Sequence, residues 1–175
     1  MALVWTLDLA KCTGCRSCSV ACVMENNTRR GLFYRWVVDT QLRSIPASGA
    51  NLRYVSMGCF HCADPACIPA CPVPNAITKD AATGAVIIDQ ALCIGCKRCA
   101  GSCPYGAPQF NESTRRMEKC HFCKQRLDAG LKPACVMTCV GRALNYDTDV
   151  NVTPGGTPPT GFSSSSLTNP SIFFA

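Results

Sequence analysis

No apolar run in this chain reaches the roughly 18–20 residues that a membrane-spanning helix needs. The N-terminal segment has neither a basic leader nor a cleavage site, so the sequence predicts no signal peptide and no membrane span of its own. The chain also has no Ser–His–Asp set, no paired carboxylates in a shared motif and no phosphate-cradling glycine-rich loop. These absences favour a protein without its own catalytic centre. Any attachment to a membrane would have to come through a partner.

What the sequence has in excess is cysteine, with sixteen residues that fall into four sets of four. The first and third sets are spaced C-x2-C-x2-C-x3-C, the run that holds cubane clusters in bacterial ferredoxins. The second set widens the middle gap to four residues and the fourth widens it to eleven. In chain order the sets are Cys12, Cys15, Cys18 and Cys22; Cys59, Cys62, Cys67 and Cys71; Cys93, Cys96, Cys99 and Cys103; Cys120, Cys123, Cys135 and Cys139. Four complete quartets predict four [4Fe–4S] clusters and a protein that relays electrons.

The fourth cysteine of such a run points away from the cluster that the first three bind, and ligates a neighbouring cluster. Only Cys71 and Cys103 end a quartet and precede a proline, and 21 residues separate Cys71 from Cys93. We therefore predict an inner pair of second and third quartets, enclosed by an outer pair of first and fourth. The predicted ligand sets are Cys12, Cys15, Cys18 and Cys139 (site a); Cys22, Cys120, Cys123 and Cys135 (site b); Cys59, Cys62, Cys67 and Cys103 (site c); Cys71, Cys93, Cys96 and Cys99 (site d).

Two other uses of cysteine are alternatives to iron. Disulfides fit an even count, but three cysteines within seven residues cannot easily find separate, well-shaped partners. Zinc fits the C-x2-C spacing, although zinc ribbons use two separated C-x2-C pairs without a third cysteine close behind. Pro72 and Pro104 complete the ferredoxin run after the second and third quartets. Iron is therefore the expected metal, and a colourless preparation would indicate zinc instead.

Charged residues are also scarce, at 16% of the chain, and aromatic residues make up only 7%. The formal charge of +6 counts every cysteine as neutral, whereas an oxidised [4Fe–4S] core bound by four thiolates carries about −2. Four such clusters bring the loaded protein to about −2, so the basic residues balance the clusters. Because no aromatic residues interleave with a basic stripe, the sequence does not predict nucleic-acid binding.

An internal repeat of strand, cluster loop, short helix and return strand predicts an α+β fold with two ferredoxin-like modules. When the first quartet is aligned with the third, Asp8 aligns with Asp89 and Gly14 with Gly95. At both glycines the missing Cβ would permit a positive φ and a close approach of backbone N–H groups to the cluster sulfurs. The predicted organisation is an outer module at 1–22 and 112–150, a β-hairpin insertion at 23–58, an inner module at 59–111 and an extended tail at 151–175.

The insertion contains two candidate strands, 33–39 and 52–57, joined by a loop with Pro46 and Gly49. We interpret this hairpin as a cover over apolar surface near the clusters. The alternative is that Trp36 and Tyr34 contact a partner protein.

The tail is rich in proline, glycine and serine, a composition typical of disordered segments. It nevertheless ends in the apolar residues Ile172, Phe173 and Phe174. This ending predicts an anchor, and we expect the tail to pack along a partner subunit.

Basic and imidazole side chains lie beside the predicted ligands. A cation near a cluster favours the reduced state and raises its potential, and charge compensation on a solvated loop is the open alternative. The cations are Arg16, Lys97, Arg98 and Lys119. His61 and His121 lie inside C-x2-C gaps, but no cysteine is missing there, so we expect them to hydrogen-bond or pack rather than bind iron.

Three runs around the quartets are specific enough to resemble a known family. They are CFHCADPAC at 59–67, CPYGAPQFN at 103–111 and CVMENN at 22–27. Over residues 1 to 146 the chain resembles the iron–sulfur electron-transfer (beta) subunit of complex molybdopterin oxidoreductases, a four-cluster ferredoxin-like family. Within it, the iron–sulfur subunits of dimethyl sulfoxide reductase and polysulfide reductase are the type that it resembles.

This resemblance implies a non-catalytic subunit of an anaerobic respiratory complex that relays single electrons through four [4Fe–4S] clusters. The expected partners are a large catalytic subunit with a molybdenum or tungsten bis-pterin cofactor and an integral membrane subunit that exchanges electrons with quinone. Site a would face the catalytic subunit, and electrons would pass by sites b and c to site d at the membrane subunit. The complex would lie on the periplasmic face, co-exported with its partner, rather than on the cytoplasmic face. The alternative from another class is a freestanding soluble polyferredoxin.

Overall fold

Each cysteine quartet lies between two short strands in the computed structural model, which describes residues 2–40, 54–149, 151–159 and 161–175. The strands that lead into the quartets are β1 (Leu3–Leu7), β3 (Tyr54–Gly58), β5 (Val86–Ile88) and β7 (Arg116–Glu118). The strands that follow them are β2 (Arg35–Asp39), β4 (Ile77–Lys79), β6 (Gln109–Asn111) and β8 (Leu144–Thr148). The protein is therefore a small mixed α/β fold organised around its four cysteine loops.

The strands pair in a closed series. Each strand that follows a quartet pairs antiparallel with the strand that leads into the next quartet, as β2 does with β3, β4 with β5 and β6 with β7. The last of them, β8, pairs antiparallel with β1, which leads into the first quartet. The β1–β8 pair therefore joins the two ends of the series and brings the first and fourth quartets together.

Short helices begin inside the first, third and fourth quartets, and within the described residues none follows the second. They are α1 (Ser17–Asn26), α2 (Arg98–Ser102), α3 (Lys124–Asp128) and α4 (Ala134–Met137). In α1 the buried residues Cys18 and Cys22 are about one turn apart, so one helix face carries both thiols. None of the described helices is long and apolar enough to cross a membrane.

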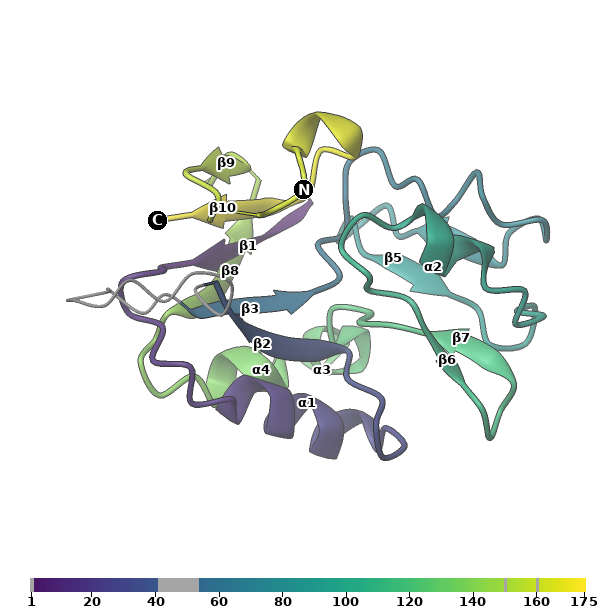
Figure 1. The fold of residues 1–175 in the computed structure, drawn as a ribbon, viewed down its shortest axis with the longest axis horizontal. Coiled ribbons are helices and arrows are strands. Elements are labelled where there is room, and N and C mark those ends of the chain that lie inside the picture. Colours follow the sequence, from purple (N-terminus) through teal and green to yellow (C-terminus); the bar gives the residue numbers. More distant parts are fainter. Residues whose placement is uncertain (1, 41–53, 150, 160) are drawn as a thin grey trace.

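The tail completes the largest sheet, which has the strand order β8-β1-β10-β9 (Figure 1). Its elements are β9 (Gly155–Gly156), the 3-10 helix η1 (Ser165–Leu167) and β10 (Ile172–Phe174). Strand β10 runs parallel to β1, and both Ile172 and Phe174 are buried in the core. Sequence analysis assigned this apolar end to a partner subunit, whereas the structure places it in the protein's own core. The reason is that β1 has a free edge, which β10 fills.

The insertion forms the expected hairpin, with Trp36 of β2 opposite Met57 of β3. Pro46, Gly49 and the start of the second predicted strand lie outside the described residues. Trp36 itself is half-buried.

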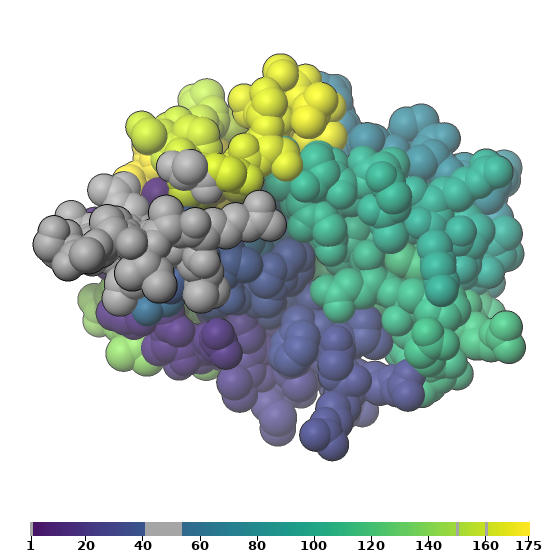
Figure 2. Space-filling view, in the orientation of Figure 1, coloured from purple at the N-terminus to yellow at the C-terminus, as the bar shows by residue number. Residues whose placement is uncertain are grey.

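The centre of the fold is aromatic and sulfur-rich. The ring of Trp5 stacks on that of Phe122, with centroids 4.0 Å apart and an interplanar angle of 7°. His61 packs on the same Phe122 ring at 5.0 Å. Figures 1 and 2 show β5, β6, β7 and α2 at one end of the molecule and α1 with the large sheet at the other. Cys59 and Cys62 of the second quartet and Cys120 and Cys135 of the fourth belong to one buried core cluster.

Candidate metal centres

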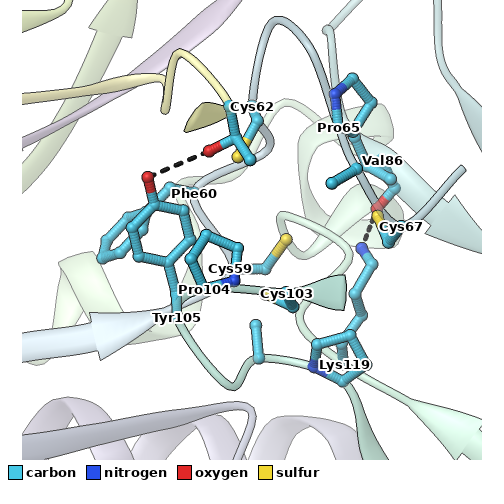
Figure 3. A pocket seen from close by; sticks show the side chains of 14 residues that line it. Cys59, Phe60, Cys62, Pro65, Cys67, Val86, Cys103, Pro104, Tyr105 and Lys119 are labelled. Carbon is cyan, nitrogen blue, oxygen red and sulfur yellow. Dashed lines mark hydrogen bonds between the residues drawn. The ribbon is translucent and has the colours of Figure 1, made fainter. Parts of the chain in front are cut away.

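Four cysteines from two quartets line one cavity in the inner half of the molecule (Figure 3). They are Cys59, Cys62, Cys67 and Cys103, the set predicted for site c, and the space among them is about 360 Å³, part of it open to solvent. Burial raises the pKa of Cys62 to about 11 and that of Cys67 to about 12. A thiolate at this place therefore needs a positive partner such as a metal.

Two further cavities have similar sizes and similar walls. One, of about 340 Å³, is lined by the site a set Cys12, Cys15, Cys18 and Cys139. The other, of about 290 Å³, is lined by the site d set Cys71, Cys93, Cys96 and Cys99. In each cavity three cysteines come from one quartet and the fourth comes from another. The three cavities thus have matching composition and nearly equal volume.

The remaining four cysteines, those predicted for site b, are all buried. Burial raises the pKa of Cys22, and the thiolates of Cys120, Cys135 and Cys123 raise it further, which places the four groups close together. Burial also raises the pKa of Cys120 and of Cys135 to about 11. All sixteen cysteines lie within the described residues, and all are free.

The four loops share one backbone feature, at the second residue after the first cysteine of each quartet. This residue has a positive φ in every loop: Gly14 (70°), His61 (46°), Gly95 (69°) and Phe122 (61°). The positive φ expected at the two glycines is therefore confirmed. A Cβ at Gly14 would come within 2.6 Å of the Tyr54 ring, and one at Gly95 would overlap the carbonyl oxygen of Arg115. A side chain at either glycine would therefore collide with neighbouring protein atoms.

Several N–H groups point at cysteine sulfurs, as the stabilisation of thiolates requires. The backbone N–H groups of Met117, Leu144 and Phe122 donate to the Sγ atoms of Cys93 (3.3 Å), Cys139 (3.3 Å) and Cys120 (3.4 Å). The side-chain amide of Asn26 donates to Cys22 Sγ at 3.6 Å. These donors serve sites d, a and b.

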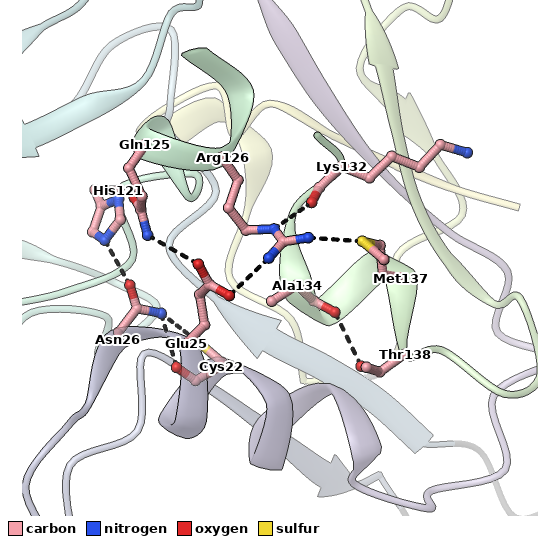
Figure 4. Close-up of polar contacts among 10 residues, drawn as sticks. All are labelled: Cys22, Glu25, Asn26, His121, Gln125, Arg126, Lys132, Ala134, Met137 and Thr138. Atoms are coloured by element: carbon pink, nitrogen blue, oxygen red, sulfur yellow. Dashed lines mark hydrogen bonds and ion pairs between the residues drawn. The ribbon is translucent and has the colours of Figure 1, made fainter. Parts of the chain in front are cut away.

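His121 positions the Asn26 amide (Figure 4). Nδ1 of His121 accepts from the Lys124 N–H at 3.2 Å, so Nε2 carries the proton and donates to Asn26 Oδ1 at 2.8 Å. Beside it, Glu25 on α1 pairs with Arg126 on α3 at 2.8 Å. The expectation that His121 forms hydrogen bonds is confirmed.

His61 also packs and hydrogen-bonds rather than standing free. Its Nδ1 accepts the Val86 N–H at 3.0 Å, and burial lowers its pKa well below the ordinary value. Its Nε2 is buried and has no hydrogen-bond partner. Because Nδ1 accepts a hydrogen bond, the proton of His61 is on Nε2. This buried N–H could donate to a neighbouring acceptor such as a cluster sulfide.

The basic residues beside the ligands divide into two kinds. Arg16, Lys97 and Arg98 are exposed, which favours charge compensation on a solvated loop. Lys119 is buried at the wall of site c and donates to the carbonyl oxygens of Val86 and Cys120. A second buried cation, Arg35, was not recognised in the sequence; it lies in the hairpin rather than beside a ligand. The only feature of the sequence that could have indicated a buried arginine is its position in an apolar strand.

The residues present fit anionic iron–sulfur clusters. Each cavity has at least one thiol whose pKa burial raises, such as Cys12, Cys62 and Cys99, and N–H groups point at cysteine sulfurs. Among the described residues, Arg35 and His61 also have buried N–H groups without partners. Within the described residues, no three or more His, Cys, Asp or Glu side chains are arranged to hold a single metal ion.

The comparison with known proteins gives the same picture. Residues 50–149 match the family model described as a 4Fe-4S dicluster domain. The chain is 40% identical to the B subunit of tetrathionate reductase from Salmonella typhimurium over 137 residues, which is 78% of this chain and 54% of that protein. It is 35% identical to the B chain of anaerobic dimethyl sulfoxide reductase from Escherichia coli over 146 residues, 80% of this chain and 70% of that protein. It is 34% identical to the B subunit of selenate reductase from Mesobacillus selenatarsenatis over 173 residues, 80% of this chain and 58% of that protein. The sequence thus spans between 54% and 70% of the length of these relatives.

Proposed function

Because this protein belongs to the family of iron–sulfur electron-transfer subunits of molybdopterin oxidoreductases, we propose that it relays single electrons through four [4Fe–4S] clusters. The relay runs between a catalytic subunit with a molybdenum or tungsten bis-pterin cofactor and a quinone-reactive membrane subunit. The clusters accept and release one electron at a time. The protein's own residues bind them, order them and exclude water from them.

The gathering of cysteines from different quartets carries this proposal. Cys103 of the third quartet lines the cavity of the second, and Cys139 of the fourth lines the cavity of the first. Crossed ligation of this kind is the ferredoxin pattern. It supports the ligand sets of sites a, b, c and d as given above.

Contacts between the sets support a linear order. The Cys18 thiolate of site a raises the pKa of Cys135 of site b, and the Cys59 thiolate of site c raises that of Cys120 of site b. Cys67 of site c and Cys71 of site d pack against the same small apolar group, which includes Ile77 and Val86. The proposed path is therefore a, b, c, d, or the reverse.

The exposure of the sets agrees with this order. Cys15 of site a and Cys96 of site d are exposed, whereas all four thiols of site b are buried. Exposed apolar side chains flank both ends, among them Val140 beside site a and Ile94 inside the loop of site d. We propose that the catalytic subunit covers the first and the membrane subunit the second, on the periplasmic side.

The strand pairing supports the proposed modules. The β1–β8 pair joins residues 1–22 to residues 112–150, and the β4–β5 pair lies inside 59–111. Residues 23–58 supply the hairpin that packs between them.

The test is a reductive titration of the purified native complex, with iron analysis and electron paramagnetic resonance (EPR) spectra. This chain should take up one electron at each of four clusters, and chemical analysis should find molybdenum or tungsten in the large subunit. A colourless chain with zinc, or fewer than four cluster signals, would contradict the proposal. A chain that elutes alone from a sizing column would instead indicate a free polyferredoxin. Accessibility of the complex to protease in intact cells tests the periplasmic location.

A further inference from the structure

Arg35 is a buried cation without a carboxylate partner among the described residues. The side chain lies in β2 and is 1% exposed. Its Nη1 donates to the carbonyl oxygen of Ser56 at 3.3 Å and to Ser56 Oγ at 3.2 Å. The guanidinium lies 4.3 Å from the centroid of the Trp5 ring, and Nε and Nη2 have no hydrogen-bond partner within the part of the chain that the structure describes. Burying an uncompensated charge is strongly unfavourable, so Arg35 requires an anion close by.

The groups around Arg35 that can carry negative charge are cysteine thiolates. Burial opposes the charged guanidinium, but the thiolates outweigh burial and raise the pKa of Arg35. They belong to two different sites: Cys135, Cys120 and Cys22 to site b, and Cys18 to site a. The geometry agrees for site b, because the Trp5 ring that faces the guanidinium stacks on Phe122, which lies between Cys120 and Cys123.

Ser56 extends this influence to site a by a hydrogen bond. Its Oγ lies 3.4 Å from Cys18 Sγ. Because Ser56 Oγ accepts from Arg35 Nη1, its hydroxyl proton is free to donate to the Cys18 sulfur. The two strands of the hairpin therefore supply one donor each, Arg35 from β2 and Ser56 from β3.

We propose that Arg35 is the shared counter-charge of sites a and b, and that it raises the reduction potentials of both clusters. This inference rests on the ligand sets of the proposed function. Reduction adds a negative charge to a cluster, so a fixed cation beside it favours the reduced state. The effect is strong because a buried site screens charge poorly. The hairpin is then part of the electron relay and not only a cover.

Lys119, the other buried cation in the described part of the chain, lies at a different site from Arg35. Lys119 lies at the wall of site c, and it lowers the pKa of Cys67 there against the larger effect of burial. Arg35 therefore serves the outer pair of sites and Lys119 the inner one. Site d has only exposed cations in its loop, Lys97 and Arg98.

The test is an EPR-monitored redox titration of the intact complex with Arg35→Gln and Arg35→Lys. Arg35→Gln should lower the reduction potentials of two of the four clusters by at least about 59 mV. For a one-electron couple, this shift is a tenfold change in the equilibrium constant of reduction. Arg35→Lys keeps the charge and should retain most of the wild-type value. A Cys15→Ser variant identifies the signal of site a. Full iron content with four unshifted potentials in Arg35→Gln would overturn the proposal.

Two further variants separate charge from structure. Ser56→Ala removes the hydroxyl that contacts Cys18 and Arg35 but keeps the Arg35 charge and its hydrogen bond to the Ser56 carbonyl oxygen, so it should lower the potential of site a and leave site b unchanged. Arg30→Gln removes an exposed cation and should shift none of the four. If Arg35→Gln fails to assemble, the titrations of Ser56→Ala and Arg35→Lys test the proposal instead. An unchanged potential of site a in Ser56→Ala would refute it. A fall of both potentials in Arg35→Lys, as large as that expected for loss of the charge, would also refute it. Fewer than four clusters in the wild-type complex would instead refute the proposed function.

Discussion

The two quartets with regular ferredoxin spacing each have an exposed cysteine, whereas the two with widened spacing have none, so we call the first two loops peripheral and the second two central. The peripheral loops contain exposed Cys15 and Cys96, and each has a glycine at the position of positive φ. The central loops have His61 and Phe122 at that position, both almost completely buried. The same backbone conformation is therefore reached in two ways.

The difference lies inside the first C-x2-C gap, which has the same length in all four quartets. In the peripheral loops this gap carries a glycine, and the cysteine that ends it, Cys15 or Cys96, is exposed where a partner can approach. In the central loops the gap carries a large side chain that turns inward, as Phe122 does against Trp5. Solvent access and the packing around a cluster set its potential. The fold thus leaves a cysteine exposed at each end of the proposed relay and none in its middle.

The largest expected effect compares a central ligand with a peripheral one. Cys135→Ser replaces a thiol of the fully buried site b, which lies between sites a and c, so we expect the whole chain to lose its clusters and fail to assemble. Cys15→Ser replaces an exposed thiol, and we expect loss of roughly a quarter of the iron with three clusters kept. Iron analysis and EPR spectra of the purified complexes measure both. Equal iron loss in the two variants would abolish the distinction between core and periphery.

The second prediction concerns packing rather than ligation. Phe122→Ala removes a fully buried ring and leaves the positive φ in place, which should destabilise the complex by about 3–5 kcal/mol. Ile94→Ala, in the peripheral loop of site d, alters a side chain that is 65% exposed and should cost the cluster-loaded chain, separated from its partners, less than about 0.5 kcal/mol. The measurement is urea unfolding followed by visible absorption of the clusters. A large loss for Ile94→Ala would mean that the peripheral loop also supports the core.

Local features of this fold could be predicted from the sequence. Cysteine spacing and the prolines after two quartets indicated the four loops, and glycine at aligned positions indicated the positive φ of Gly14 and Gly95. The aligned Asp8 and Asp89 each accept backbone N–H groups two and three residues ahead, so the repeat holds at this level too. The wide gap of the fourth quartet holds the short helix α3 and a turn at Gly130.

Features that depend on distant partners could not be predicted. In the strand RWVVD both faces are apolar enough to be buried, so the sequence does not reveal that Arg35 points inward. The parallel pairing of β10 with β1 joins residues at opposite ends of the chain, which no local pattern encodes. His61 and Phe122 occupy a position where glycine is the usual signal, and only their burial explains them.

The smallest expected effect separates the two reasons for glycine in a peripheral loop. Gly95 and Gly106 have nearly the same φ, 69° and 65°, but only at Gly95 would a Cβ overlap a neighbour, the carbonyl oxygen of Arg115. Gly106→Ala should therefore cost only the left-handed penalty, about 1–2 kcal/mol. Gly95→Ala adds the overlap, for about 2–3 kcal/mol in total. Urea unfolding of both variants measures the difference. Equal costs would mean that the Arg115 backbone shifts to make room for the new Cβ. The peripheral loop would then need glycine only for its positive φ, a conformation that His61 and Phe122 adopt in the central loops.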